Sequence, residues 1–370
     1  MQAPFPIKEI EKAFDIKGEY KEYRLSNDGH INNTYVVDFD EDGKTKSYLL
    51  QLINTNVFKN PDELMENIVG VTEYVSKIVE ANGGDKKREC LKVYHTVDGK
   101  PYFKDEDGNC WRIYNFILDA HTSSSIDNPA TFAKAAKAFG NFQRMLADYP
   151  SETLHETIPN FHNTASRYED FEKAVKDNIA GRADKVSKEI EFVRARKADT
   201  AVLVDMLKKG ELPLRVTHND TKLNNVMLDN KTNEGICVID LDTVMPGLSL
   251  YDFGDSIRFG ANTAVEDEKD LSKVSLSLEL YKAYAEGYLG AAGKSLTKTE
   301  VEYLPFASKL MTFECGMRFL TDYLNGDTYF RIAYDDHNLD RCHTQFVLVY
   351  DMEKKMDDMM KITQNIYAAL

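Results

Sequence analysis

A polar turn flanked by two β-branched runs constrains the fold of this chain more than any other feature. The turn "DNKTNEG" occupies residues 229–235 and is centred on residue 232. Opposed residues of an antiparallel pair have a constant index sum, here about 464, which pairs Asn225 with residue 239 or 240. We therefore expect Asn225 and Asp240 to converge at the open end of a hairpin, with Asp220 on the loop that leads into it.

These side chains suit one kind of chemistry. Mg²⁺ prefers oxygen ligands and takes one or two from a protein, beside substrate phosphates. The spacing H-x-D-x-K-x-x-N matches the kinase catalytic loop, in which the Asp orients the attacking hydroxyl and the Asn binds metal; it is formed by His218, Asp220, Lys222 and Asn225. Each residue alone would more often form a turn, but the combination predicts phosphoryl transfer. Asp240 would be the second metal ligand, and His218 is expected to be structural.

Charge and composition exclude several classes of protein. Of the 370 residues, 46 are Lys or Arg and 61 are Asp or Glu, and the net charge of −15 argues against a nucleic-acid or anionic-membrane partner. No apolar run approaches the roughly 20 residues of a membrane span, and the first residues contain no apolar signal core. The Cys residues show no CxxC spacing, which predicts reduced thiols in a cytoplasmic protein.

Hydrophobic periodicity divides the chain into a strand-rich first third and a mainly helical remainder. A helix is expected from Pro61, with Asn60 as its cap. Strands are expected at 20–25, 34–39, 47–53, 90–97 and 110–118. Further helices are expected at 129–146, within 160–210, and from about 266 to the end. The patterns predict an α+β protein in which a small sheet with one helix precedes a larger helical body that contains the hairpin.

The polar motifs, taken in order, resemble those of a known group of enzymes. The stretches "HNDTKLNN", "VIDLDTV" and "YDFGDSIRFG" resemble the aminoglycoside phosphotransferase and choline kinase superfamily. With "GHINNTY" (29–35), "LLQLIN" (49–54) and "ECGMRFLTDYLNGDTYF" (314–330), the set is most similar to the N-acetylhexosamine 1-kinase group. The motifs span residues 29 to 330, so the resemblance covers most of the chain.

The resemblance implies a protein-kinase-like, two-lobe fold, with a nucleotide-binding lobe at 1–117 and a catalytic and acceptor-binding lobe at 118–370. It also implies an enzyme that uses ATP and Mg²⁺ to phosphorylate an N-acetylhexosamine at its anomeric C1 hydroxyl. It implies no nucleic-acid, membrane or protein partner beyond these small molecules. An amino alcohol or an aminoglycoside is the alternative acceptor, because the sequence alone does not place the many acidic residues relative to the acceptor.

The resemblance also implies roles for individual residues. Asp220 would be the catalytic base and contact the acceptor, and Lys222 would lie near the γ-phosphate. The metal ligands would be Asn225 and Asp240, with Asp242 as a second-metal or supporting residue. The nucleotide lid would contain Gly29, His30, Ile31, Asn32 and Thr34, and the adenine hinge would contain Tyr114, Phe116 and Ile117. His30 would also contact the acyl-amino end of the sugar, whereas Asp252 and Asp255 would hold backbone groups.

One residue departs from the kinase pattern. The strand lysine that pairs with the α- and β-phosphates is expected in "YLLQL", where this chain has Gln51. A neutral amide cannot supply that charge, so Lys222, the lid backbone and Mg²⁺ would have to compensate at the nucleotide. The N-acetylhexosamine 1-kinase group shares this Gln, so activity is still expected.

The acceptor side is expected on a buried helix. Residues 310–324 are apolar almost all round, which is typical of a helix without a solvent face. Arg318 is a charge within this helix and needs a partner. Glu314, four residues earlier, is one candidate partner, and the oxygens of a bound sugar are the other; the resemblance favours the sugar.

Two further interpretations compete with a kinase. "VIDLDTVM" fits the signature of haloacid-dehalogenase-like phosphatases, with Asp240 as nucleophile and Asp242 as acid. That motif normally opens a parallel α/β domain, whereas helical patterns follow it here. The absence of the strand lysine would fit a nucleotide-binding pseudokinase, but the presence of Asp220, Asn225 and Asp240 argues against one.

Overall fold

The computed structural model describes residues 3–26, 32–123, 126 and 128–370, and its N-terminal part contains an antiparallel sheet. Its strands are β1 (Glu19–Leu25), β2 (Asn33–Glu41), β3 (Lys44–Leu52), β4 (Val93–Tyr94), β5 (Phe103–Lys104) and β6 (Cys110–Asn115). They are ordered β1-β2-β3-β6-β4, and β5 pairs with β6. The first three predicted strands are confirmed. The runs at 90–97 and 110–118 form shorter strands than predicted.

Two helices cover the two faces of this sheet, although only one was predicted. The additional helix is α1 (Ile7–Ala13), which has only 7 residues and is therefore too short for a clear periodic signal. Ile10 packs with Phe14 and Trp111 on one face of the sheet. The other face is covered by α2 (Pro61–Ala81), whose first turn is capped as predicted, because the side chain of Asn60 accepts from the backbone N–H of Glu63.

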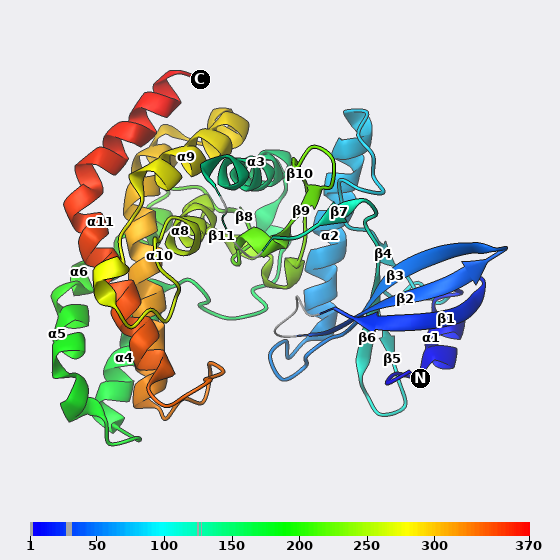
Figure 1. Cartoon of the computed structure of the whole chain (residues 1–370), viewed down its shortest axis with the longest axis horizontal. Helices are drawn as coiled ribbons and strands as arrows, with labels where there is room; N and C mark the ends of the chain where they lie inside the picture. The colour runs from blue at the N-terminus through cyan, green and yellow to red at the C-terminus, as the bar shows by residue number, and fades with distance from the viewer. Residues whose placement is uncertain (1–2, 27–31, 124–125, 127) are drawn as a thin grey trace.

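The C-terminal part is mainly helical, as predicted, and lies beside the sheet in Figure 1. Its helices are α3 (Pro129–Met145), α4 (Thr164–Asp177), α5 (Ser187–Ala195), α6 (Lys197–Thr200), α7 (Val202–Lys208), α8 (Ser249–Gly260), α9 (Leu278–Ala292), α10 (Lys298–Leu324) and α11 (His337–Ala368). Three predictions need correction. The charged pattern at 160–210 is split into short helices, "SLYDFGDSIRFG" is helix α8, and the helix expected from 266 begins at Leu278. None of the helices in the described ranges is both long and apolar enough to cross a membrane.

The hairpin has the predicted register. Its strands are β9 (Val226–Asp229) and β10 (Gly235–Val238), and they pair Val226 with Val238 and Met227 with Cys237, which gives the index sum 226 + 238 = 464. The register shifts between Gly235 and Cys237. Two short ladders complete the region: β7 (Ala120–His121) pairs with β9, and β8 (Arg215–Thr217) pairs with β11 (Met245–Gly247). The loop at 218–225 therefore starts from one ladder and ends in the other.

The largest hydrophobic core is continuous between the two parts of the chain. It includes the apolar face of α2, with Leu64, Ile68 and Val75, and extends through the hairpin into α8, α9 and α10. The outer face of the sheet has a smaller core of its own. The helix α2 thus joins the sheet to the helical part, as its central position in Figure 1 also shows.

Candidate active site

The loop that carries Asp220 is held by a buried carboxylate on α8. The side chain of Asp252 accepts from the backbone N–H groups of His218 and Asn219 at 2.9 and 2.8 Å, and also from Gln143. This confirms the predicted backbone-binding role of Asp252. Asp255 was expected to do the same, but it forms an ion pair with Arg258 at 2.9 Å instead.

The buried side chain of His218 binds the backbone of the Asp220 loop, which confirms its structural role. Its Nδ1 accepts from the backbone N–H of Asp220 at 3.2 Å, so the ring proton resides on Nε2, which donates to the carbonyl of Ile239 at 2.8 Å. Because Ile239 precedes Asp240, this one imidazole connects the loop of Asp220 with the strand that leads to Asp240. The ring is fully buried.

Besides His218, Asp220 contacts the other two residues that were grouped with it from spacing. Its Oδ1 lies 2.9 Å from Nζ of Lys222, and the amide of Asn225 donates to its backbone carbonyl at 2.8 Å. Burial would lower the pKa of Lys222, but the nearby Asp220 outweighs it and raises that pKa. Lys222 is therefore a cation beside a carboxylate that is about a quarter exposed, at 28%.

Asp240 stands at the end of β10 in a left-handed conformation, with φ 58° and ψ 60°. The backbone N–H of Ile239 donates to the carbonyl of Asn225 at 2.9 Å, so Asn225 and Asp240 lie at the same end of the hairpin, as expected. Solvent reaches the Asp240 side chain, yet desolvation by the surrounding protein, followed by repulsion from Asp242 and Asp220, raises its pKa to about 7.

The residues at this end of the hairpin fit a magnesium ion. In the described ranges, no hydrogen bond or ion pair engages the Asp240 carboxylate, and the hydrogen bonds of Asn225 use its NH₂ group, which leaves its Oδ1 for a ligand. Carboxylates that repel one another are stabilised by a cation between them. No group of three His, Cys, Asp or Glu side chains that could hold a metal ion occurs among the described residues.

Asp242 is already bound on both of its oxygens. Its Oδ1 forms an ion pair with Nη1 of Arg112 at 2.6 Å, and its Oδ2 accepts from the amide of Asn32. The side chain of Gln51 accepts from Nε and Nη2 of Arg112 at 3.0 and 2.8 Å and donates to Thr34 at 2.9 Å. The two described lid residues and Gln51 thus belong to one polar network with Asp242.

The expected adenine hinge follows β6. Tyr114 and Ile117 are buried in the main core, whereas Phe116 is only partly buried and lies under the guanidinium of Arg24 at 5.5 Å. The remaining lid residues, Gly29, His30 and Ile31, lie outside the described residues. Any role of these side chains toward a nucleotide therefore stays a prediction.

Arg318 on α10 has an aromatic environment instead of the carboxylate partner that was considered. Its guanidinium lies 5.4 to 5.8 Å from the ring centres of Phe161, Tyr329 and Phe330. Glu314, one turn earlier, is buried and binds Nδ1 of His162 at 2.8 Å and the hydroxyl of Thr164 at 2.6 Å. Among the described residues, no carboxylate forms an ion pair with Arg318.

The same helix face is tied to the catalytic loop. His162, which binds Glu314, also lies 3.4 Å from the carbonyl of Asn219, the residue before Asp220. Tyr329 and Phe330 are held near Arg318 because Asp322 accepts from their backbone N–H groups at 2.8 and 2.9 Å. Arg318 therefore lies on an element anchored beside Asp220.

Comparison with known families agrees with this geometry. Residues 22–295, which include the hairpin and the loop of Asp220, match the model of the phosphotransferase enzyme family. The chain belongs to this family.

Solved structures share the fold of this family member at low sequence identity. An aminoglycoside phosphotransferase from Alicyclobacillus acidocaldarius has a TM-score of 0.63 at 13% identity, with 100% of this chain and 98% of that chain covered. A microcompartment-associated aminopropanol kinase has a TM-score of 0.57 at 14% identity, covering 96% and 98%. A spectinomycin phosphotransferase in complex with ADP and spectinomycin has a TM-score of 0.53 at 16% identity, covering 96% and 99%. These likenesses show the protein-kinase-like fold that was predicted.

Sequence reasoning missed several residues of this family site. Arg112, His162 and Asn67 were not singled out, yet Asn67 on α2 donates to the carbonyl of Val244 at 3.0 Å, just after the 3₁₀ turn Leu241–Thr243. A signal existed for Arg112, because it is the one charge in the apolar run "CWRIYNFIL" and a buried charge needs a partner. No local pattern marks His162 or Asn67, whose partners lie far away in the sequence.

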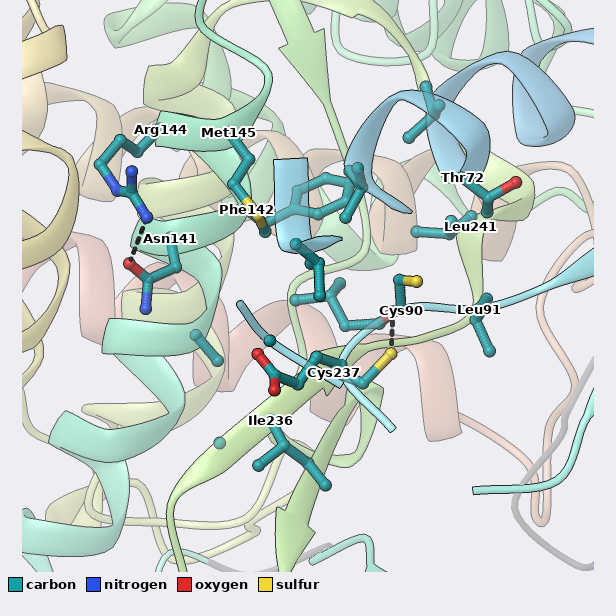
Figure 2. Close-up of a pocket in the computed structure, with 18 of the residues that line it drawn as sticks. Thr72, Cys90, Leu91, Asn141, Phe142, Arg144, Met145, Ile236, Cys237 and Leu241 are labelled. Atoms are coloured by element: carbon teal, nitrogen blue, oxygen red, sulfur yellow. Dashed lines mark hydrogen bonds between the residues drawn. The ribbon is translucent and has the colours of Figure 1, made fainter. Parts of the chain in front are cut away.

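A cavity of about 250 Å³ lies between α2, α3 and β10. Figure 2 shows Phe142 and Met145 of α3 on one side and Cys90 and Cys237 on another. Leu241, which follows Asp240, also lines it. The side chains of Asp220, Lys222, Asn225 and Asp240 do not line this cavity, so it is separate from the loop of Asp220.

Proposed function

We propose that the protein is a Mg²⁺-dependent kinase that transfers the γ-phosphoryl group of ATP to the anomeric C1 hydroxyl of an N-acetylhexosamine. The observation that carries the transfer is the convergence of Asp220, Lys222 and Asn225 at the open end of the hairpin, next to Asp240. The ordered motif set resembles N-acetylhexosamine 1-kinases. The solved structures of the same fold include a spectinomycin phosphotransferase described in complex with ADP and, in a second structure, with AMP.

The chemistry assigns one task to each residue. A carboxylate oxygen of Asp220 orients the acceptor hydroxyl and takes its proton as the new O–P bond forms and the bond from the γ-phosphorus to the bridging oxygen of ADP breaks. Lys222, 2.9 Å from Asp220, places positive charge beside the transferred phosphoryl group. Asn225 and Asp240 would hold Mg²⁺, which neutralises phosphate charge when bound.

The charge on the acceptor side supports a neutral sugar over an amine. Arg318 has no carboxylate partner among the described residues, and Arg167 lies close enough to it that burial and the charge of Arg318 together lower the pKa of Arg167. A site with two guanidinium groups repels an ammonium ion, whereas the N–H groups of a guanidinium donate well to hydroxyl and carbonyl oxygens. The nearby Glu314 is occupied by His162 and Thr164 and so is not free for an amine.

A coupled assay of ADP release decides the acceptor class. We expect turnover with N-acetylglucosamine or N-acetylgalactosamine and little with plain hexoses, choline, aminopropanol or aminoglycosides. Correlation of ³¹P with ¹H in the product should place phosphorus on C1. A 1-deoxy analogue should compete with the sugar without being phosphorylated. Turnover with an amino alcohol or aminoglycoside alone, or phosphorus on C6, would move the protein to another kinase group.

A further inference from the structure

A charge from the sheet is buried against the turn that carries Asp240. The side chain of Arg112 on β6 is 1% exposed and that of Asp242 is 5% exposed, and their charged atoms are 2.6 Å apart. Asp242 follows Asp240 by two residues and forms part of the short 3₁₀ turn Leu241–Thr243. The second oxygen of Asp242 accepts from Asn32, so both groups that bind it come from the N-terminal part.

The ion pair between Arg112 and Asp242 differs in position from the corresponding ion pair of protein kinases. In those enzymes a strand lysine is held by a glutamate of the adjacent helix. Here the strand position is Gln51, which binds Arg112 from the neighbouring strand, and α2 presents the sulfur of Met65 to Nη1 of Arg112 at 3.8 Å. The carboxylate that neutralises the guanidinium of Arg112 is therefore Asp242, which lies in the 3₁₀ turn after Asp240.

The position of Asp240 depends on both of its flanks. Left-handed backbone is rare for a residue other than glycine and is held by its neighbours. Upstream, the N–H of Ile239 is fixed to Asn225. Downstream, Asp242 is bound by Arg112, and the carbonyl of Val244 is bound by Asn67.

We propose that Arg112 and Asp242 are positioning residues that act as one ion pair between the two parts of the chain, set the place of Asp240, and thereby determine the Mg²⁺ affinity of the site. Asp242 acts through this pair and is not itself a metal ligand. The inference rests on the proposed function, since it takes Asp240 as a ligand of Mg²⁺. Groups that orient metal ligands typically change metal affinity by roughly 10- to 100-fold when removed.

The test measures binding of ADP by calorimetry, with and without Mg²⁺, so that no acceptor is needed. We expect Arg112→Met and Asp242→Asn each to lower the Mg²⁺ affinity of the ADP complex by roughly 10- to 100-fold, with ADP binding in the absence of Mg²⁺ nearly unchanged. The double variant should be no worse than the singles, because both remove the same pair. Arg215→Met, which removes one partner of the buried pair with Glu300, is the matched control and should lower the melting temperature alone.

Three results would overturn the inference. The first is parental Mg²⁺ affinity in the double variant, which would limit the pair to fold stability. The second is loss of Mg²⁺ affinity in Asp242→Asn with none in Arg112→Met, which would make Asp242 a direct ligand. The third applies where Arg112→Met does not fold: Asp242→Asn, which removes the charge from the other side of the pair, then carries the test, and unchanged Mg²⁺ affinity in it would count against the pair. Failure of the parent protein to bind ADP would instead contradict the proposed function.

Discussion

The side-chain oxygen of Gln51 on β3 accepts two hydrogen bonds from Arg112, which is directly opposite it on β6. The neutral amide in the place of the kinase lysine therefore stands beside a buried guanidinium. Burial lowers the pKa of Arg112, but the adjacent Asp242 outweighs it and raises that pKa, so the cation is permanent. The positive charge that β3 lacks at Gln51 is therefore present on the neighbouring strand β6, at Arg112.

Asp220→Asn should lower kcat by roughly 10²- to 10⁴-fold, because an amide cannot accept the proton of the attacking hydroxyl. The affinity for ADP should stay near that of the parent protein. Steady-state kinetics and calorimetry measure the two quantities. Asp148→Asn, a carboxylate outside the loop, is the control, and a near-normal kcat in Asp220→Asn would remove Asp220 from the catalytic role.

Asn225→Ala and Asp240→Ala should each raise the Mg²⁺ concentration for half-maximal activity by at least about tenfold, since even supporting groups of a metal site are worth that much. Titration of activity with Mg²⁺ at saturating ATP and acceptor gives this value. Asn230→Ala, in the turn of the same hairpin, should leave it unchanged. Curves for both site variants that overlay the parent curve would place the metal elsewhere.

Arg318→Ala should raise the KM for the acceptor by roughly 10- to 150-fold, the equivalent of about 1.5–3 kcal/mol for a hydrogen bond to a charged group. The KM for ATP should change little. The exposed Arg331, close to Tyr329 and Phe330 in sequence, provides the control variant Arg331→Ala. Equal effects of the Arg318 and Arg331 variants on the acceptor would argue against a contact.

Glu314 makes the protein less stable in acid. Burial would raise its pKa, but His162, Arg318 and Thr164 outweigh burial and hold the pKa below the ordinary value of 4.5. The carboxylate therefore stabilises the fold above about pH 4.5, and this contribution is lost as the pH falls through the lower folded-state pKa. Urea unfolding should show a stability difference between the parent protein and Glu314→Gln at pH 7 that shrinks below pH 4.5. A difference independent of pH would show that the charge of Glu314 does not matter.

The free thiols predicted from cysteine spacing are confirmed, and their burial predicts how they react. Cys90, Cys110, Cys237 and Cys342 are buried, whereas Cys315 is partly exposed. Burial raises the pKa of Cys315 to about 11, so even this thiol should be alkylated slowly near neutral pH. Mass spectrometry should find at most the Cys315 adduct on the native protein and all five cysteines modified after unfolding without reductant. A native adduct at Cys237 would contradict this burial.

Local sequence patterns predicted those features of the fold that depend on residues close together in the chain. The cap at Asn60 and the hairpin register depend on neighbouring residues, so both could be predicted. The helix α8 was missed although Leu250, Phe253 and Ile257 follow helical spacing, because the polar residues between them are buried as well. In the candidate site, spacing alone brought Asp220 and Asn225 together. The pairing of Arg112 with Asp242 joins positions 130 residues apart (242 − 112), and such a contact leaves no periodic trace.

The continuous core determines which fragments of this chain could fold on their own. The apolar face of α2 packs into the same core as the hairpin and α10, and its Asn67 binds the backbone of His155 as well as that of Val244. A fragment that ends at residue 117 would leave this face bare. Each exposed Leu, Ile or Val side chain costs about 1.5–3 kcal/mol, and several of them together equal the whole stability of an ordinary domain, about 5–15 kcal/mol. The parts of the chain before and after residue 117 therefore depend on each other to fold, because α2 packs into the core that they share.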